Sequence, residues 1–172
     1  LPVNPGNRFS SYDLMEGLLL FQKKRKNPCT YSLEPGGQLE WASSPFVSLH
    51  DISSQWDDHI NQLEKLCCDN KTLPVDFAID PLYSPEEIKL IDMKKYRFMN
   101  DMFKSVGTHG MWMMRNSASV QVNIDMVSRR DGENMAFIAD CLQPFCSFLF
   151  SHVPFTQKGC VENKNYRLHV WN

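Results

Sequence analysis

The segment Pro35-Gly36-Gly37 constrains the fold more than any other part of this sequence. Proline holds its φ angle near the value that the first central position of a β-turn needs, and glycine supplies the positive φ that can follow. Two short runs of β-forming residues, 30–34 and 38–43, flank this turn. We therefore predict a β-hairpin, whose two strands pair antiparallel.

Apolar side chains recur at helical spacing in several longer stretches, as in the stripe of Leu49, Ile52, Trp56, Leu63 and Leu66 within 48–68. The segment Ser84-Pro85-Glu86-Glu87 is the clearest helix start, since it offers a serine cap, proline at the first position and acids in the first turn. We predict helices from Ser10-Ser11 to the basic run that starts at Lys23, over 48–68, over 84–104, and from 131 to about 149.

Three further segments are predicted as strands, at 75–80, 119–126 and 166–171. In the second of these, Val120, Val122 and Ile124 alternate with the polar residues Gln121, Asn123 and Asp125, as in a strand with one buried face. Strands and helices do not alternate regularly. The chain is therefore expected to be α+β, a single domain over 1–172, with helices on one face of a mainly antiparallel sheet.

Composition excludes some classes of function. The formal net charge is -2 and the pI is about 6.2, so the chain lacks the cationic excess that general nucleic-acid binding requires. No apolar run reaches the length of a transmembrane helix.

The chain begins at Leu1 rather than at a methionine, which leaves open a removed leader or an excised piece.

Cysteine and histidine residues give no firm metal signal. The six cysteines include no Cys-x-x-Cys pair, so we expect reduced thiols rather than a zinc or dithiol site. His109, His152, His169 and Cys160 could be drawn together as a metal site, but nothing in their spacing demands it.

Polar residues are expected to gather on the uncovered face of the sheet. Alternation places Glu34, Gln38, Glu40, Gln121 and Asn123 there. Carboxylates on neighbouring strands are suitable Mg²⁺ ligands and leave room for nucleotide phosphates. A solvated polar face with no ligand is the alternative interpretation of the same pattern.

Several blocks of this sequence resemble plant- and proteobacterial-type glutamate–cysteine ligases. The run Glu34-Pro35-Gly36-Gly37-Gln38-Leu39-Glu40 is similar to the Glu-Pro-Gly-Gly-Gln-x-Glu signature of that family. Further blocks follow in the family's order and spacing: Gly107-Thr108-His109-Gly110, Met113-Met114, 120–125, Leu142-Gln143-Pro144, Pro154-Phe155-Thr156, Tyr166-Arg167, His169 and Trp171.

The resemblance implies an ATP- and Mg²⁺-dependent enzyme that joins cysteine to the γ-carboxyl of glutamate through a γ-glutamyl phosphate, on a curved antiparallel sheet related to glutamine synthetase. It implies that Glu34, Gln38 and Glu40 bind the nucleotide, with Glu34 and Glu40 as metal ligands. Catalytic roles would fall to Gln121 and Asn123 in the same cleft and to Arg167, whose planar guanidinium suits an anionic group.

The sequence also departs from the family. Members are more than twice this length, and an N-terminal block that supplies further metal carboxylates has no counterpart here. A family arginine falls at Asn116, with Arg115 one residue away, and a family Asn-Ser pair is replaced by His152-Val153. Because phosphoryl transfer depends on positioned charges, these changes point away from full activity.

Two hypotheses follow. The first is a non-catalytic ligase-like subunit, held with other protein subunits in a larger organellar assembly. The second is a fragment of an active glutamate–cysteine ligase that uses Mg²⁺ and ATP. The plastid location of plant relatives favours a plastid over a mitochondrion and leaves the cytoplasm open.

Overall fold

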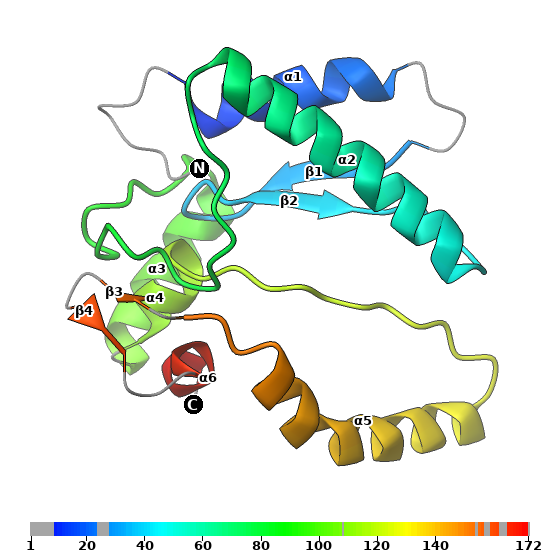
Figure 1. The fold of residues 1–172 in the computed structure, drawn as a ribbon. Coiled ribbons are helices and arrows are strands. Elements are labelled where there is room, and N and C mark those ends of the chain that lie inside the picture. Colours follow the sequence, from blue (N-terminus) through cyan, green and yellow to red (C-terminus); the bar gives the residue numbers. More distant parts are fainter. Residues whose placement is uncertain are drawn as a thin grey trace.

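A computed structural model describes residues 9–23, 28–107, 109–153, 155–156, 159–161 and 165–171. Thr108 and Pro154, which belong to the motifs quoted above, lie outside the described residues. Six helices and two short antiparallel ladders follow one another along this part of the chain (Figure 1). The predicted α+β class is therefore confirmed, although the sheets are much smaller than expected.

The first predicted helix and the predicted hairpin are both present. Helix α1 spans Ser11–Gln22 and starts with a capping box, in which the Ser10 side chain accepts from the Asp13 backbone and the Asp13 carboxylate accepts from the Ser10 backbone. Strands β1 (Thr30–Leu33) and β2 (Leu39–Ala42) pair antiparallel, with Leu33 opposite Leu39. The glycine-containing turn thus joins two antiparallel strands, as predicted.

Helix α2 spans Leu49–Asp69 and, with α1, lies over the hairpin (Figure 1). Ser48 caps it by accepting from the backbone N–H of His50. The buried residues Leu14, Leu18 and Cys67 form the core between these elements, and Leu63 and Leu66 pack against it as predicted. The predicted apolar stripe is only partly right, because Leu49 and Trp56 are exposed while the buried face carries Gln55 and His59.

The predicted helix over 84–104 is wrong in its first half. Helix α3 spans only Lys94–Val106, and residues 84–93 form turns. The backbone groups of this segment are used elsewhere: Ile91 N–H donates to Pro35 O at 2.8 Å, and Ile88 O and Pro85 O accept from the Arg115 guanidinium. A helix cannot form where tertiary partners occupy the groups that its hydrogen-bond ladder needs.

The predicted strand at 75–80 is reduced to a single bridge between Ile79 and Ser117, within an extended segment. Asp80 N–H donates to Asn116 O at 2.9 Å, and Ala118 N–H donates to Ala78 O at 3.0 Å. Helix α4 begins directly after His109 and spans Gly110–Arg115. Helix α3 packs against α4.

The predicted strand at 119–126 is extended but has no strand partner within the described residues. Its apolar and polar side chains are all exposed, with Val120 at 90% and Val122 at 78% of full exposure. Helix α5 (Arg129–Leu149) follows as predicted, but none of its residues is buried. The residue patterns of 119–126 and α5 are typical of elements with one buried face, but neither element buries a face here.

The C-terminal part differs from prediction. Strands β3 (Phe155–Thr156) and β4 (Gly159–Cys160) form a second short ladder, and residues 166–171 form helix α6 (Tyr166–Trp171) instead of a strand. The Asn165 side chain accepts from Leu168 N–H at 3.3 Å, as a helix cap does. This local cap and packing against α4 override the β-forming composition of the segment.

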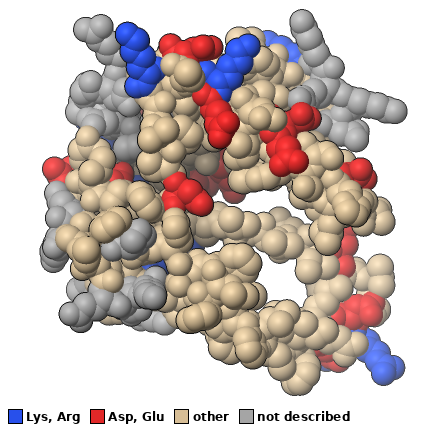
Figure 2. Space-filling model, in the orientation of Figure 1, with Lys and Arg blue, Asp and Glu red and all other residues tan. Residues whose placement is uncertain are grey.

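The expected curved sheet is not seen among the described residues, where β1–β2 and β3–β4 are separate two-stranded ladders. Figure 2 shows charged side chains gathered over α1 and α2, and a mainly uncharged surface along the extended segment and α5, with openings beside that segment. Within the described part of the chain, no helix combines the length and apolarity needed to cross a bilayer.

Candidate functional site

The hairpin has one polar face, which carries Ser32, Glu34, Gln38 and Glu40. The register sets Ser32 opposite Glu40, and the bond from Glu34 N–H to Gln38 O at 2.9 Å continues the pairing by one step. Side chains alternate between faces along a strand, so these four share one side while Leu33 and Leu39 pack into the core on the other. The structure thus brings together three predicted site residues, Glu34, Gln38 and Glu40.

The environment of Glu34, including the charge of Glu40 on the same face, shifts its pKa. Partial burial raises the pKa of Glu34, the negative charge of Glu40 raises it further, and Lys95 acts in the opposite direction. Glu40 Oε2 accepts from the Ser32 hydroxyl at 2.6 Å. Diagonal cross-strand neighbours typically have Cβ atoms about 7–8 Å apart. Two carboxylates on one face, with the charge of Glu40 raising the pKa of Glu34, are a suitable but partial ligand set for a divalent cation.

Gln38 connects the hairpin to the segment that follows α4. Its Nε2 donates to Ser117 O at 3.0 Å and to Met114 O at 3.3 Å, and its Oε1 accepts from Gly36 N–H at 2.9 Å. These bonds use both amide donors and one acceptor position. Gln38 therefore holds the turn in place, and it has little capacity left for a nucleotide in this arrangement.

The turn of the hairpin is packed closely against Arg115. A Cβ atom added at Gly36 would lie 2.7 Å from Arg115 Cα and would also overlap the Arg115 carbonyl. Gly37 has a positive φ of 83°, which glycine adopts at little cost. Pro35 O accepts from Ile91 N–H at 2.8 Å. The Pro-Gly-Gly run thus fixes the position of Glu34 relative to α4.

Arg115 and Asn116 form a structural network. The Arg115 guanidinium donates to Pro85 O at 3.1 Å, to Ile88 O at 2.8 Å and to Asn100 Oδ1 at 2.7 Å. Burial lowers its pKa, and Glu86 raises it. Asn116 is buried and its Nδ2 donates to Tyr83 O at 2.6 Å. The Arg115 charge is therefore used inside the protein and not on the polar face of the hairpin.

The remaining predicted site residues are not assembled with the hairpin. Gln121 and Asn123 lie in the exposed extended segment. Arg167 lies on α6, where burial lowers the pKa of its half-buried guanidinium. The charges that shift the pKa of Glu34 are those of Glu40 and Lys95, and Arg167 is not among them. Their predicted catalytic roles stay predictions.

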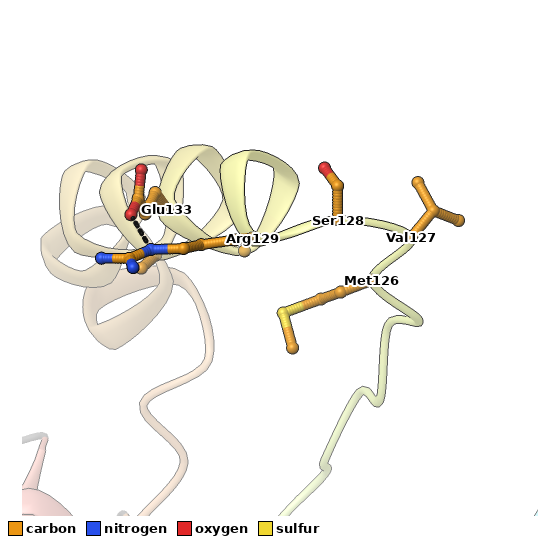
Figure 3. A pocket seen from close by; sticks show the side chains of 7 residues that line it. Met126, Val127, Ser128, Arg129 and Glu133 are labelled. Atoms are coloured by element: carbon orange, nitrogen blue, oxygen red, sulfur yellow. Dashed lines mark hydrogen bonds and ion pairs between the residues drawn. The ribbon is translucent and has the colours of Figure 1, made fainter.

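A surface hollow at the start of α5 contains none of the predicted site residues. It is lined by Met126, Val127, Ser128, Arg129, Gly132, Glu133 and Ala136. Figure 3 shows Met126 pointing toward the helix and the Arg129 guanidinium paired with Glu133, at 2.8 Å. This ion pair is exposed and already satisfied, so the hollow offers little binding energy for a polar ligand.

One residue of the polar face was not predicted. Ser32 is two positions before Glu34 and therefore on the same side of β1, a relationship that strand alternation alone could have revealed. Among the described residues, no cluster of three or more His, Cys, Asp or Glu side chains could hold a metal ion. Glu34 and Glu40 could contribute to a Mg²⁺ site only together with oxygen ligands from elsewhere.

Comparison with known proteins gives a consistent result. Residues 9–172 match the family model described as glutamate–cysteine ligase family 2 (GCS2). The chloroplastic glutamate–cysteine ligase of Arabidopsis thaliana is 29% identical over 164 residues, which cover 95% of this chain and 31% of that protein. The chloroplastic enzyme of Brassica juncea is also 29% identical over 164 residues and is covered to 32%.

A relative from rice gives the same result as the Arabidopsis and Brassica enzymes. The chloroplastic glutamate–cysteine ligase A of Oryza sativa subsp. japonica is 27% identical over 140 residues, which cover 81% of this chain and 28% of that protein. The chain thus spans about a third of the length of these curated relatives.

Proposed function

Because this chain belongs to the glutamate–cysteine ligase family 2, we propose that it is the central part of an ATP- and Mg²⁺-dependent glutamate–cysteine ligase, the enzyme of the first step of glutathione synthesis. The observation that supports this most directly is the polar face of the hairpin. Glu34 and Glu40 lie on one side of it, inside the Glu-Pro-Gly-Gly-Gln-Leu-Glu run, and the fold fixes their spacing.

The proposed roles follow from the chemistry of the side chains. Bound Mg²⁺ would offset the charge of the ATP phosphates during transfer to the γ-carboxyl of glutamate. Glu34 and Glu40 would hold the metal, and the Ser32 hydroxyl, which donates to Glu40, would orient that carboxylate. Arg167 would bind an anionic group of substrate or phosphate, and Gln121 and Asn123 would hydrogen-bond the substrate.

We propose further that the hairpin and residues 119–126 become strands of one curved antiparallel sheet, as in glutamine synthetase, when the rest of the ligase is present. The alternation of Val120, Val122 and Ile124 with polar residues supports this, because both faces of that segment are exposed in this chain. Backbone groups of an isolated extended segment bond only to water, and a neighbouring strand would pair them. The chain would then be one part of a single catalytic domain.

A plastid is the proposed location. The relatives named above are chloroplastic enzymes, and each is similar to nearly the whole of this chain or to most of it.

A non-catalytic role as an accessory subunit is the second candidate. Two observations favour this role. The three observed hydrogen bonds of the Arg115 guanidinium stabilise the fold. The neighbouring position, where the family has an arginine, is occupied by the buried Asn116. The uncovered α5 would then bind other protein subunits.

The deciding experiment measures γ-glutamylcysteine formation and Mg²⁺-dependent ATP binding in the protein that contains this chain in its natural assembly. Under the first proposal, Glu34→Gln and Glu40→Gln each lower both quantities by on the order of tenfold or more. Glu64→Gln, at an exposed position on α2, is the matched control and leaves them unchanged. Absence of product at saturating glutamate, cysteine and ATP would reject the ligase and leave the accessory role.

A further inference from the structure

His109 and His169 are 60 positions apart in the sequence but lie next to each other where α4 meets α6. Their ring centres are 5.5 Å apart and the ring planes are inclined by 57°. His109 directly precedes α4 without capping it through its side chain, and His169 is exposed on α6. Within the described residues neither imidazole makes a hydrogen bond or an ion pair, so the ring nitrogens remain available to a ligand.

The spacing of the two rings is that of two imidazoles on one metal ion. An imidazole nitrogen binds zinc at about 2.0–2.1 Å, which puts the metal roughly 3.2 Å from the ring centre. Two rings that subtend about 110–120° at the metal then have centres roughly 5.2–5.5 Å apart. The observed 5.5 Å agrees with this range.

The type of donor selects the class of metal. Neutral imidazole prefers Zn²⁺, Ni²⁺ and Cu²⁺, whereas Mg²⁺ prefers oxygen ligands. The pair is therefore unsuited to the magnesium of the proposed ligase and would form a separate site. Tyr166 lies beside it, with its ring centre 5.7 Å from that of His169, and Trp112 packs edge-on against Tyr166 at 6.4 Å.

We propose that His109 and His169 form a two-histidine site for a divalent transition metal of the zinc class, which joins α6 to α4. No third His, Cys, Asp or Glu completes the set within the described part of the chain, so water occupies the remaining positions and the ion is exchangeable. Each neutral imidazole donates a nitrogen lone pair, and a protonated one releases its proton to solvent. The bound metal opposes separation of α6, the helix that carries Arg167.

Zinc titration of the metal-free, untagged chain against a chromophoric chelator tests the site. One Zn²⁺ is expected to bind per chain, and His109→Gln and His169→Gln should each weaken its binding at least tenfold. His152→Gln is the matched control, because His152 stacks on Phe77 at 5.6 Å, and it should leave zinc binding unchanged. The proposal is overturned if the wild-type chain does not bind zinc, or if His109→Gln and His169→Gln bind zinc as tightly as the wild type does.

A second measurement on the wild-type chain does not depend on the folding of any variant. Zinc should slow amide hydrogen exchange in 166–171, and millimolar Mg²⁺ should not. Exchange that zinc leaves unchanged rejects the joining of α6 to α4. Neither measurement uses ATP, glutamate or cysteine, so a negative result here is distinct from a failure of the proposed ligase function.

Discussion

Gly36 and Arg115 are in direct backbone contact, although 79 positions separate them in the sequence. The turn of the hairpin approaches the last residue of α4 so closely that any side chain at Gly36 would overlap the Arg115 backbone. The overlapped atoms are main-chain atoms, which cannot rotate away as the end of a flexible side chain can. This contact fixes the polar face of the hairpin relative to the C-terminal half of the chain.

Gly36→Ala is therefore expected to destabilise the chain by about 2–3 kcal/mol, since one element must move to admit the methyl group. Urea unfolding followed by circular dichroism measures this. Gly107→Ala is the matched control, because a Cβ there would have no neighbour within 4 Å and its φ of -164° suits any residue. The control should change the free energy of unfolding by less than about 1 kcal/mol. Equal effects of the two substitutions would contradict the close contact.

Replacing Arg115 should test its structural role. Arg115→Met keeps much of the aliphatic volume but leaves Pro85 O, Ile88 O and Asn100 Oδ1 without their donor. A cost of about 2–3 kcal/mol is expected from these unpaired acceptors. Arg129→Met removes an exposed arginine that pairs with Glu133 and should cost less than about 0.5 kcal/mol. If Arg115→Met leaves the free energy of unfolding unchanged, the guanidinium is not needed for the fold.

His59 is expected to make the stability of the chain sensitive to acid. It is buried, its ring stacks on Trp41 at 5.3 Å and its Nδ1 lies 3.0 Å from the Tyr31 hydroxyl. Burial lowers its pKa from 6.5 to about 4, so the folded state favours the neutral ring. This contribution is fully present above pH 6.5 and is lost as the pH falls through about 4.

The loss should be on the order of 2 kcal/mol, allowing for solvent screening. Urea unfolding at a series of pH values between 7 and 4 measures it. His59→Gln cannot ionise and should show a shallower decline of stability over this interval, whereas His50→Gln, at an exposed position on α2, should follow the wild type. Parallel pH curves for the wild type and His59→Gln would exclude His59 as the cause.

Because no residue of α5 is buried, we predict that its apolar side chains contribute little to the stability of this chain. Leu142→Ala, at a side chain that is 50% exposed, should change the free energy of unfolding by less than about 0.5 kcal/mol. Leu18→Ala, at a fully buried position on α1, should cost about 2–5 kcal/mol. Chemical denaturation of the two variants gives the comparison. A large effect of Leu142→Ala would show that α5 is packed in solution.

Several segments with strong local signals were predicted well, although the helix start at Ser84-Pro85 was not. The capped start of α1, the start of α2 near Ser48 and the Pro-Gly-Gly turn each occur where the sequence indicated, because caps and turns depend on neighbours a few residues away. The shared polar face of Glu34, Gln38 and Glu40 followed from the same register. Segments 84–93 and 166–171 were predicted wrongly, since distant partners decide their conformation.

The sequence by itself determined the hairpin, the helices α1, α2 and α5, and the side of β1 and β2 on which the carboxylates lie, because each depends on residue type and spacing alone. Only the tertiary structure decided that Arg115 is used inside the protein, that residues 84–93 form turns and that His109 meets His169. These depend on which backbone and side-chain groups become neighbours when distant segments pack, and a hydrogen-bonding group committed to one partner is no longer available to another.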